Sequence, residues 1–386
     1  MNISLTDVKT IDVHCHPYLE NPSPFSEIEF LEHLSLSVLP NMFQEKEQSE
    51  KIYPGMNMYM QITIQKLAKY FSCEPTVEAV VKKRNELAKK FPEYTKNLFE
   101  DVQLKGLLLD FGYPQPPISK NKYNEITGVP SWEVYRIEPL MDNLRESSSN
   151  FTDFIDKYRE ELNTQLSKSS VFGLKSIIAY RSGLDIGKMD KDKASIQYKE
   201  FQENKRSTVK ELRDYCIHVA MEECTKADKV LHIHTGVGDG EVILSKASPS
   251  MLVDMLREEK YKNTKVHLVH GGYPWMEEAA FLTSILPNVY MDISLQNPFI
   301  GHGVKRIISQ VFEFAPFNKV MYGSDAFTVP EMNWLGVLLF KECFEEVLES
   351  WVQKDYMDAE TAQYIGEMVL YRNFESVYKK DLELQR

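Results

Sequence analysis

Short β-like runs alternate with longer helical patterns along this chain, and no other feature constrains its fold as strongly. We predict strands at Thr10–His14, Leu104–Phe111, Val134–Glu138, Phe172–Arg181, Lys229–His234, Lys265–His270, Val289–Ser294 and Lys319–Tyr322. Amphipathic helical patterns lie between them at Ser207–Lys226, Ser250–Glu259, Trp275–Leu286 and Val304–Phe314. Such alternation is typical of parallel β/α units. The pattern predicts a (β/α)8 TIM barrel, with a doubly wound open sheet as the alternative.

The spacing of the predicted strands is uneven near the N-terminus. The long stretch between the first two strands exceeds an ordinary connection, so residues 20–101 are expected to hold structure of their own. Helical patterns at Phe30–Leu39, Met56–Phe71 and Thr76–Lys90 predict a helical insertion over the barrel mouth. Ala359–Lys380 predicts a further pair of helices packed outside the barrel. We therefore expect residues 1–386 to form a single domain.

The composition of the chain limits the kinds of molecule it can be expected to bind. The net charge of -12 argues against nucleic acid or an acidic membrane surface, because phosphate groups are bound by clustered Lys and Arg. The five cysteines are an odd number and form no Cys-x-x-Cys pair, which favours a reducing, cytoplasmic location. No signal-peptide pattern or membrane-length apolar run is present in the sequence. We expect a small-molecule substrate, and self-association stays open.

Two His-x-His motifs close predicted strands. His14 and His16 end the first strand, and His232 and His234 end the fifth. Side chains two residues apart on a strand point to the same face, so His14 and His16 can reach one metal ion. The alternative is a pair of buried hydrogen-bonding histidines.

Further metal-binding side chains follow other predicted strands. His270 ends the sixth strand, and Asp325 follows the eighth. In α/β barrels the reactive groups converge at the carboxyl ends of the strands, so these residues, His14, His16 and His234 are expected to meet at the mouth. Imidazole and carboxylate ligands suit zinc, manganese or iron. The alternative for Asp325 is a helix N-cap.

Several segments give this chain a family resemblance. Gly173–Leu184, His234–Asp239, His270–Trp275 and Tyr322–Ala326, together with the first His-x-His motif, resemble the amidohydrolase-2 group of the amidohydrolase superfamily. Within that group the chain resembles the barrel domain that is fused to glutamine synthetase in FluG- and nodulin-type proteins. The resemblance runs from residue 8 to about residue 380 and is weak through the helical insertion.

The resemblance implies a ligand set. His14, His16 and Asp325 would bind the more buried metal, and His234 and His270 would bind a second ion or complete the first. In binuclear relatives a lysine at the position of Lys175 is carbamylated and bridges two ions, whereas in mononuclear relatives it is not a ligand. Zinc is the expected metal, with manganese as the alternative. The alternative role for Lys175 is a structural ion pair with a neighbouring carboxylate.

The expected chemistry is metal-dependent hydrolysis of an amide-type C–N bond in a small polar metabolite. Asp325 would act as ligand and proton shuttle, with His270 as a second catalytic group. A decarboxylase or a lactonase on the same scaffold is an alternative, and a non-catalytic regulatory barrel is an alternative of another class. These alternatives stay open.

Substrate contacts are predicted for two residues outside the ligand set. Arg181 lies six residues after Lys175, on the same face if the strand stays regular, and could bind a substrate carboxylate or phosphate. Its alternative is a structural ion pair. Asp239 could hold a substrate amine or form a turn. Arg136 and Glu138 share a face of the third predicted strand and are expected to pair with each other.

Three further residues are assigned structural roles. His232 should lie one layer deeper than His234, as a core hydrogen-bonding residue. His267 lies three residues before His270 and is expected to face the opposite way, under a helix. Cys15 alternates away from His14 and His16 and should pack behind the strand as a small apolar residue.

Overall fold

Eight parallel strands form the centre of the computed structural model, which describes residues 3–18, 24–36, 55–114, 118–204 and 207–385. The strands are β1 (Thr10–Cys15), β2 (Leu104–Asp110), β3 (Ser131–Arg136), β4 (Val171–Ser176), β5 (Val230–His234), β6 (Val266–Val269), β7 (Val289–Asp292) and β9 (Val320–Met321). They pair in that order, each parallel to the next.

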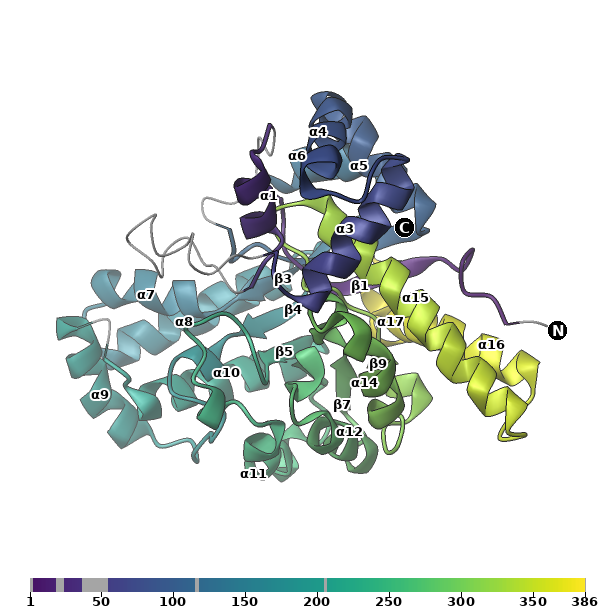
Figure 1. Cartoon of the computed structure of the whole chain (residues 1–386). Coiled ribbons are helices and arrows are strands. Elements are labelled where there is room, and N and C mark those ends of the chain that lie inside the picture. The colour runs from purple at the N-terminus through teal and green to yellow at the C-terminus, as the bar shows by residue number, and fades with distance from the viewer. Residues whose placement is uncertain (1–2, 19–23, 37–54, 115–117, 205–206, 386) are drawn as a thin grey trace.

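Backbone hydrogen bonds join the two ends of this sheet. The amide of Val13 donates to the carbonyl of Tyr322 at 3.1 Å, and the amide of Asp325 donates to the carbonyl of His14 at 2.8 Å. The segment that follows β9 thus lies along β1 and closes the ring. The predicted (β/α)8 TIM barrel is confirmed (Figure 1).

Helices follow the strands and surround the barrel. They are α6 (Lys120–Thr127), α7 (Glu138–Ser147), α8 (Phe151–Leu166), α9 (Lys191–Glu203), α10 (Lys210–Ala227), α11 (Val253–Leu256), α12 (Met276–Ile285), α13 (Gln296–Phe299), α14 (Val304–Val311) and α15 (Pro330–Gln353). In α14 the buried residues Val304, Ile307, Ile308 and Val311 have the i, i+3, i+4, i+7 spacing of one helix face. None of the helices described is both long enough and apolar enough to span a bilayer.

The predicted helical insertion lies between β1 and β2. Its helices are α1 (Glu27–His33), α3 (Met58–Phe71), α4 (Val77–Leu87) and α5 (Phe91–Asp101). Side-chain caps fix where three of them begin: Ser26 for α1, Asn57 for α3 and Thr76 for α4. The helix predicted at Phe30–Leu39 therefore starts earlier, and residues 37–39 lie outside the described part of the chain.

The C-terminal segment does more than cover the outside of the barrel. It contains α16 (Ala359–Glu367), a π-helical turn (Met368–Arg372), α17 (Asn373–Val377) and α18 (Lys379–Glu383). We call the floor cluster the buried group in which C-terminal side chains meet side chains of the barrel strands: Ile11, Val13, Leu108, Trp132, Val134, Phe172, Val230, Met321, Phe374, Val377 and Tyr378. The C-terminal helices thus lie outside the barrel, as predicted, and close its amino-terminal end.

The third and fourth strands end earlier than predicted. The third strand ends at Arg136, because a helix begins at Glu138 with Pro139 in its first turn. The fourth strand ends at Ser176 instead of Arg181. There Glu138 Oε1 accepts hydrogen bonds from Ser176 Oγ (2.7 Å) and the Ile177 amide (2.8 Å), and the chain turns into a short 3-10 helix, Ile178–Tyr180.

Candidate metal centre

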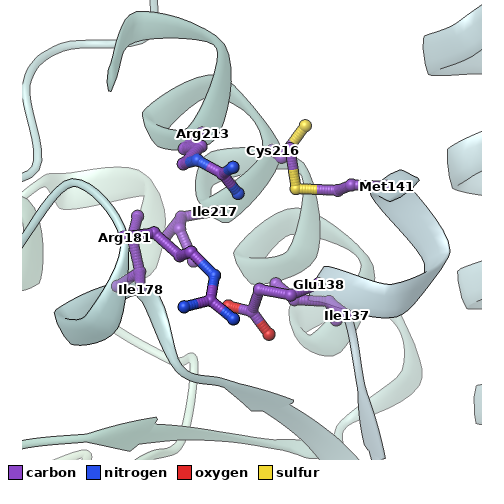
Figure 2. Close-up of a pocket in the computed structure, with 8 residues that line it drawn as sticks. All are labelled: Ile137, Glu138, Met141, Ile178, Arg181, Arg213, Cys216 and Ile217. Atoms are coloured by element: carbon purple, nitrogen blue, oxygen red, sulfur yellow. The ribbon is translucent and has the colours of Figure 1, made fainter. Parts of the chain in front are cut away.

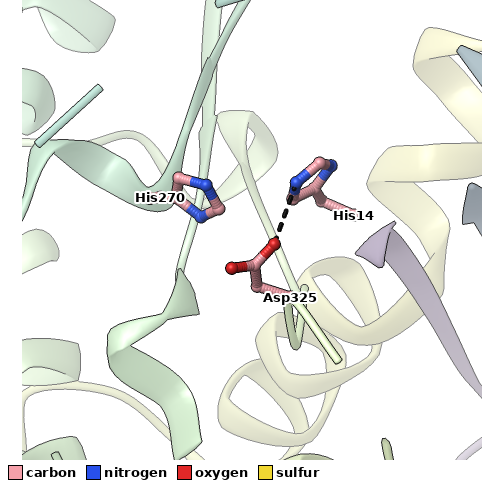
Figure 3. Close-up of side chains that lie close together, drawn as sticks. All are labelled: His14, His270 and Asp325. Atoms are coloured by element: carbon pink, nitrogen blue, oxygen red, sulfur yellow. Dashed lines mark ion pairs between the residues drawn. The ribbon is translucent and has the colours of Figure 1, made fainter. Parts of the chain in front are cut away.

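The barrel brings the predicted ligands together at the carboxyl ends of its strands. The side chains of His14, His270 and Asp325 lie together (Figure 3). One ligand atom of each is within 4.8 Å of the others. His16 Nε2 is 3.3 Å from Asp325 Oδ1, and the ring of His234 is centred 4.5 Å from that of His270. The five predicted imidazole and carboxylate groups therefore surround one buried region.

Two of these residues have an unusual backbone. His270 has φ of +69° and Asp325 has φ of +57°, in the left-handed region that non-glycine residues seldom adopt. Such strain costs roughly 1–3 kcal/mol per residue and is maintained only where the surroundings hold it. For Asp325 the holding contact is the 2.8 Å hydrogen bond from its amide to the His14 carbonyl. Strained ligand-type residues at strand ends are typical of functional sites.

Hydrogen bonds set the orientation of the histidine rings. His16 Nδ1 lies 2.9 Å from the carbonyl oxygen of Asp110, which can only accept, so Nδ1 carries the proton. Ser294 Oγ donates to Asp292 and therefore accepts from His270 Nδ1 at 2.8 Å. In the neutral rings of His16 and His270 the Nε2 lone pair is then free to bind a cation.

The atoms at the centre fit a cation. Asp325 Oδ1 lies 3.1 Å from His14 Nε2 and 3.3 Å from His16 Nε2, yet it is buried and accepts no hydrogen bond from the described residues. His234 Nε2 is also buried without a partner there. A carboxylate oxygen and an unprotonated imidazole nitrogen both present lone pairs, so a positive ion between them is needed to make their approach favourable. The donor set of nitrogen and oxygen atoms suits zinc or manganese.

Burial keeps the histidines neutral. Removal from water, together with the positive charge of Lys175, holds the pKa values of His14 and His234 well below the usual range. For His270, burial and the neighbouring His234 have the same effect on the pKa. Neutral imidazole is the form that binds a metal.

Lys175 lies against the ligand cluster. Its Nζ is 3.3 Å from His14 Nε2, and the residue is 1% exposed. Burial lowers the pKa of Lys175 to about 8, against the opposing attraction of Asp110. A lysine with this pKa is partly neutral near physiological pH, as a nucleophilic amine must be.

Sequence reasoning missed the carboxylates that support the ligands. Burial raises the pKa of Asp110, but the positive charges of Arg136, His16 and Lys175 lower it by more. The net result is a pKa of about 2 for Asp110. Its ionised carboxylate binds Arg136, with Nη2 2.6 Å and Nε 3.0 Å from Oδ2. The predicted pairing of Arg136 with Glu138 was therefore wrong. A carboxylate at the end of a predicted strand is the signal that could have identified Asp110.

Asp292 and Asp12 accept hydrogen bonds from the backbone of the candidate ligands. Asp292 Oδ1 accepts from the His270 amide (3.0 Å) and from the Ser294 amide (2.8 Å). Asp12 Oδ1 accepts from the His14 amide (3.2 Å) and from the Ser324 amide (3.0 Å), next to Asp325. These carboxylates hold the backbone of the candidate ligands in place.

Of the two histidines deeper in the barrel, His232 lies where the sequence predicted and His267 does not. His232 is fully buried, with its Nε2 2.9 Å from Tyr378 Oη, as a core hydrogen-bonding residue should be. His267 does not pack under a helix, because its ring lies 4.8 Å from that of His232 and its Nε2 is 2.8 Å from Asp292 Oδ2. Strand alternation fails here because β6 ends at Val269 and His270 has a positive φ. Cys15 packs in the core behind β1, as predicted.

The two predicted substrate-contacting residues take different positions. Arg181 follows the 3-10 turn instead of β4, and Figure 2 shows its guanidinium beside Glu138 in a small cavity that Arg213 also lines. None of the six candidate metal ligands lines that cavity. Asp239 forms a turn, with its Oδ1 accepting from the Glu241 amide at 2.9 Å, and its own amide contacts Tyr180. Tyr180 was also missed by the sequence reasoning.

Sequence comparison agrees with this geometry. The family model described as amidohydrolase, Amidohydro_2, matches residues 205–357, a range that includes His234, His270 and Asp325. The protein FluG of Emericella nidulans is 27% identical over 224 residues, which cover 54% of this chain and 26% of FluG. The chain thus spans about a quarter of the length of this curated relative.

Solved structures share the architecture. A protein from Lactobacillus casei, described as a metal-dependent hydrolase, superposes with a TM-score of 0.85 and 24% identity, over 99% of this chain and 100% of that chain. The uronate isomerase of Thermotoga maritima superposes with a TM-score of 0.66 and 14% identity, over 97% of this chain and 95% of that chain. At these identities the likeness shows the fold.

Fold and site together define a class of protein. The chain is a TIM barrel with a candidate metal site at the carboxyl ends of its strands, and residues 205–357 match the amidohydrolase family model. The resemblance to the amidohydrolase-2 group and to FluG-type proteins, predicted from the motifs, is confirmed.

Proposed function

We propose that this protein is a metal-dependent hydrolase that cleaves an amide-type C–N bond in a small, polar, anionic metabolite. The observation that carries the proposal is the convergence of His14, His270 and Asp325, with the buried Oδ1 of Asp325 lying against histidine nitrogens. Zinc is the metal we expect, with His16 and His234 completing the ligand set. A non-catalytic barrel would not need to retain such an arrangement, because opposed lone pairs destabilise the metal-free fold.

The bound metal would supply Lewis acidity, polarising a substrate carbonyl and lowering the pKa of a coordinated water. This chain's own groups would hold the geometry and move the proton. Asp325 is 7% exposed and lies at the mouth, so its carboxylate can take a proton from water and pass it to the leaving nitrogen. His270, held by Ser294 and Asp292, would keep a second imidazole against the reacting carbonyl.

The number of metal ions in the site, one or two, depends on the chemical state of Lys175. We propose that its neutral amine reacts with carbon dioxide, forming an N–C bond and releasing a proton, and that the resulting carbamate would serve as a shared ligand if two ions bind. Its burial and the 3.3 Å separation of Nζ from His14 Nε2 support this assignment. Arg181 and Asp239 remain proposed substrate contacts, and a cytoplasmic location remains part of the proposal.

Metal analysis followed by a substrate panel tests the proposed function. Protein purified without chelators is expected to contain about one or two equivalents of zinc or manganese by plasma mass spectrometry. The panel pairs N-acyl amino acids, scored by amine release, with lactones and with aromatic carboxylates, scored by CO2 release. Amine release that is lost on chelation supports the proposal. Lactone cleavage or CO2 release alone would replace it by the corresponding alternative, and protein that takes up no metal would overturn it.

A further inference from the structure

Tyr180 places a hydroxyl group beside the candidate metal centre. Its ring packs edge-on against His234, with centroids 4.6 Å apart. A Cβ atom on Gly238 would lie 1.7 Å from Tyr180 Oη and 3.1 Å from His234 Cε1, so the hydroxyl sits next to this imidazole. Glycine at position 238 is what leaves room for it.

The Tyr180 hydroxyl already accepts one hydrogen bond, and its own proton is available to donate. The amide of Asp239 donates to Tyr180 Oη at 3.2 Å, and no described residue accepts the hydroxyl proton. A phenolic hydroxyl keeps its proton near neutral pH, so Oη carries one hydrogen that it can donate. Tyr180 is therefore held as a donor toward a ligand.

Arg136 offers a second donor at the same level of the barrel. It lies opposite Lys175 in the register of β3 and β4. Nε and Nη2 bind Asp110, whereas Nη1 makes no hydrogen bond to the part of the chain that the structure describes. The side chain is 14% exposed. One edge of the guanidinium is thus held by Asp110, and Arg136 lies on the same side of the sheet as Lys175, because paired residues of adjacent strands point the same way.

We propose that Tyr180 Oη and Arg136 Nη1 together bind a carboxylate of the substrate beside the metal centre. This inference rests on the proposed metal site and names residues that its ligand set does not include. The two donors make a substrate-binding pair, which we call the carboxylate clamp, and it selects metabolites that carry a carboxylate near the bond to be cleaved.

Charge balance favours a carboxylate over a phosphate as the group bound. Asp110 neutralises Arg136, so the clamp offers two hydrogen bonds and little net positive charge. The carboxylates of Asp239, next to Tyr180, and of Asp325, in the ligand cluster, would repel a dianion. A planar carboxylate needs two donors and carries one charge, which matches what the clamp provides.

Calorimetric titration of the zinc-loaded protein with small dicarboxylates tests the clamp. Malonate, succinate and glutarate can place one carboxylate on the metal and the other on the clamp, and their diamides serve as neutral controls. We compare the native protein with Tyr180→Phe, which removes only the hydroxyl, and with Arg136→Lys, which keeps a cation for Asp110. Arg159→Lys is the matched control, because Arg159 binds Glu222 and Glu223 between α8 and α10.

We expect at least one dicarboxylate to bind the native protein 10-fold or more tightly than its diamide. Each clamp variant should weaken that binding by about 10- to 100-fold, as the loss of a hydrogen bond to a charged group does. Arg159→Lys should leave it unchanged. If Arg136→Lys does not fold, as judged by its thermal melting, Tyr180→Phe alone decides.

Four results would overturn the clamp. They are no binding of any dicarboxylate, equal binding by the native protein and the clamp variants, equal weakening in Arg159→Lys, or tighter binding of inorganic phosphate with the same dependence on both donors. The titration does not depend on turnover. A protein that binds dicarboxylates through the clamp but hydrolyses no amide would refute the proposed function and leave the clamp standing.

Discussion

At the scale of single residues, the candidate site is defined by which atoms carry protons. The Asp110 carbonyl, Ser294 and the Val237 backbone fix the rings of His16, His270 and His234, and each leaves Nε2 available. Asp325 then supplies the negative charge at the centre. Replacing that one charge should separate catalysis from folding.

Asp325→Asn is expected to reduce turnover by at least 100-fold while preserving the fold. The asparagine amide can donate to His16 Nε2, so the metal-free variant should melt at or above the temperature of the metal-free native protein. Steady-state kinetics and thermal denaturation in chelator measure the two effects, with the exposed Asp254→Asn as control. Full turnover in Asp325→Asn would refute its role as proton shuttle.

Lys175 predicts a pH dependence. Its pKa is lowered from 10.5 to about 8, so the fraction of Lys175 in the neutral form that reacts with carbon dioxide increases from pH 6 to pH 9. Activation of the metal-depleted protein by bicarbonate and zinc should therefore increase through about pH 8, and [13C]bicarbonate should give a carbamate signal in NMR spectra.

Lys175→Ala provides the complementary test of the bridging carbamate. Activity should fall and be partly restored by short carboxylic acids, which can take the place of the carbamate. Metal content equal to that of the native protein in Lys175→Ala would show that no bridging ligand was lost.

At the scale of elements, the C-terminal helices act as the floor of the barrel. Tyr378 reaches from the end of α17 to His232, two residues before the candidate ligand His234. Phe374 and Val377 cover the aromatic side chains at the start of the strands. The stability of the strand ends thus depends on a segment that follows them by many residues in sequence.

Substitutions in the floor cluster should cost stability without removing a metal ligand. Tyr378→Phe leaves His232 Nε2 buried and unpaired and should cost about 1–3 kcal/mol. Phe374→Ala leaves a cavity and should cost about 3–5 kcal/mol. Leu384→Ala, at a residue that is 70% exposed in the same segment, should change stability by less than about 0.5 kcal/mol. Urea unfolding measures all three, and equal losses in the three variants would contradict a floor role.

At the scale of the whole molecule, a buried ion pair joins the helical insertion to the barrel. Arg84 of α4 lies 2.7 Å from Glu331 of α15, both side chains are fully buried, and Tyr94 Oη also donates to Glu331 at 2.8 Å. Glu331 follows Asp325 by six residues, so this contact lies close to the candidate site along the chain. A partly exposed counterpart, Lys66 with Glu342, joins the same two parts at 2.6 Å.

The two ion pairs should differ sharply in their effect on stability. Arg84→Ala leaves the Glu331 charge buried and is expected to lower the free energy of unfolding by about 3–5 kcal/mol. Lys66→Ala should lower it by less than about 1 kcal/mol. The double variant Arg84→Met with Glu331→Leu should recover most of the loss, because no charge then stays buried alone. Equal effects of Arg84→Ala and Lys66→Ala in urea unfolding would contradict this ranking.

The sequence by itself determined the elements and the candidate ligands. Hydrophobic periodicity is a local property, so the β/α alternation, the insertion and the residues at strand ends could be predicted, and His14, His16, His234, His270 and Asp325 follow from strand ends alone. Only the tertiary structure decided the partners. Asp110 with Arg136, Asp292 with His267, and Tyr378 with His232 pair across different elements. Pairing of this kind depends on register and on local backbone reversals such as that at His270, and both are set by packing of distant segments, which no local pattern encodes.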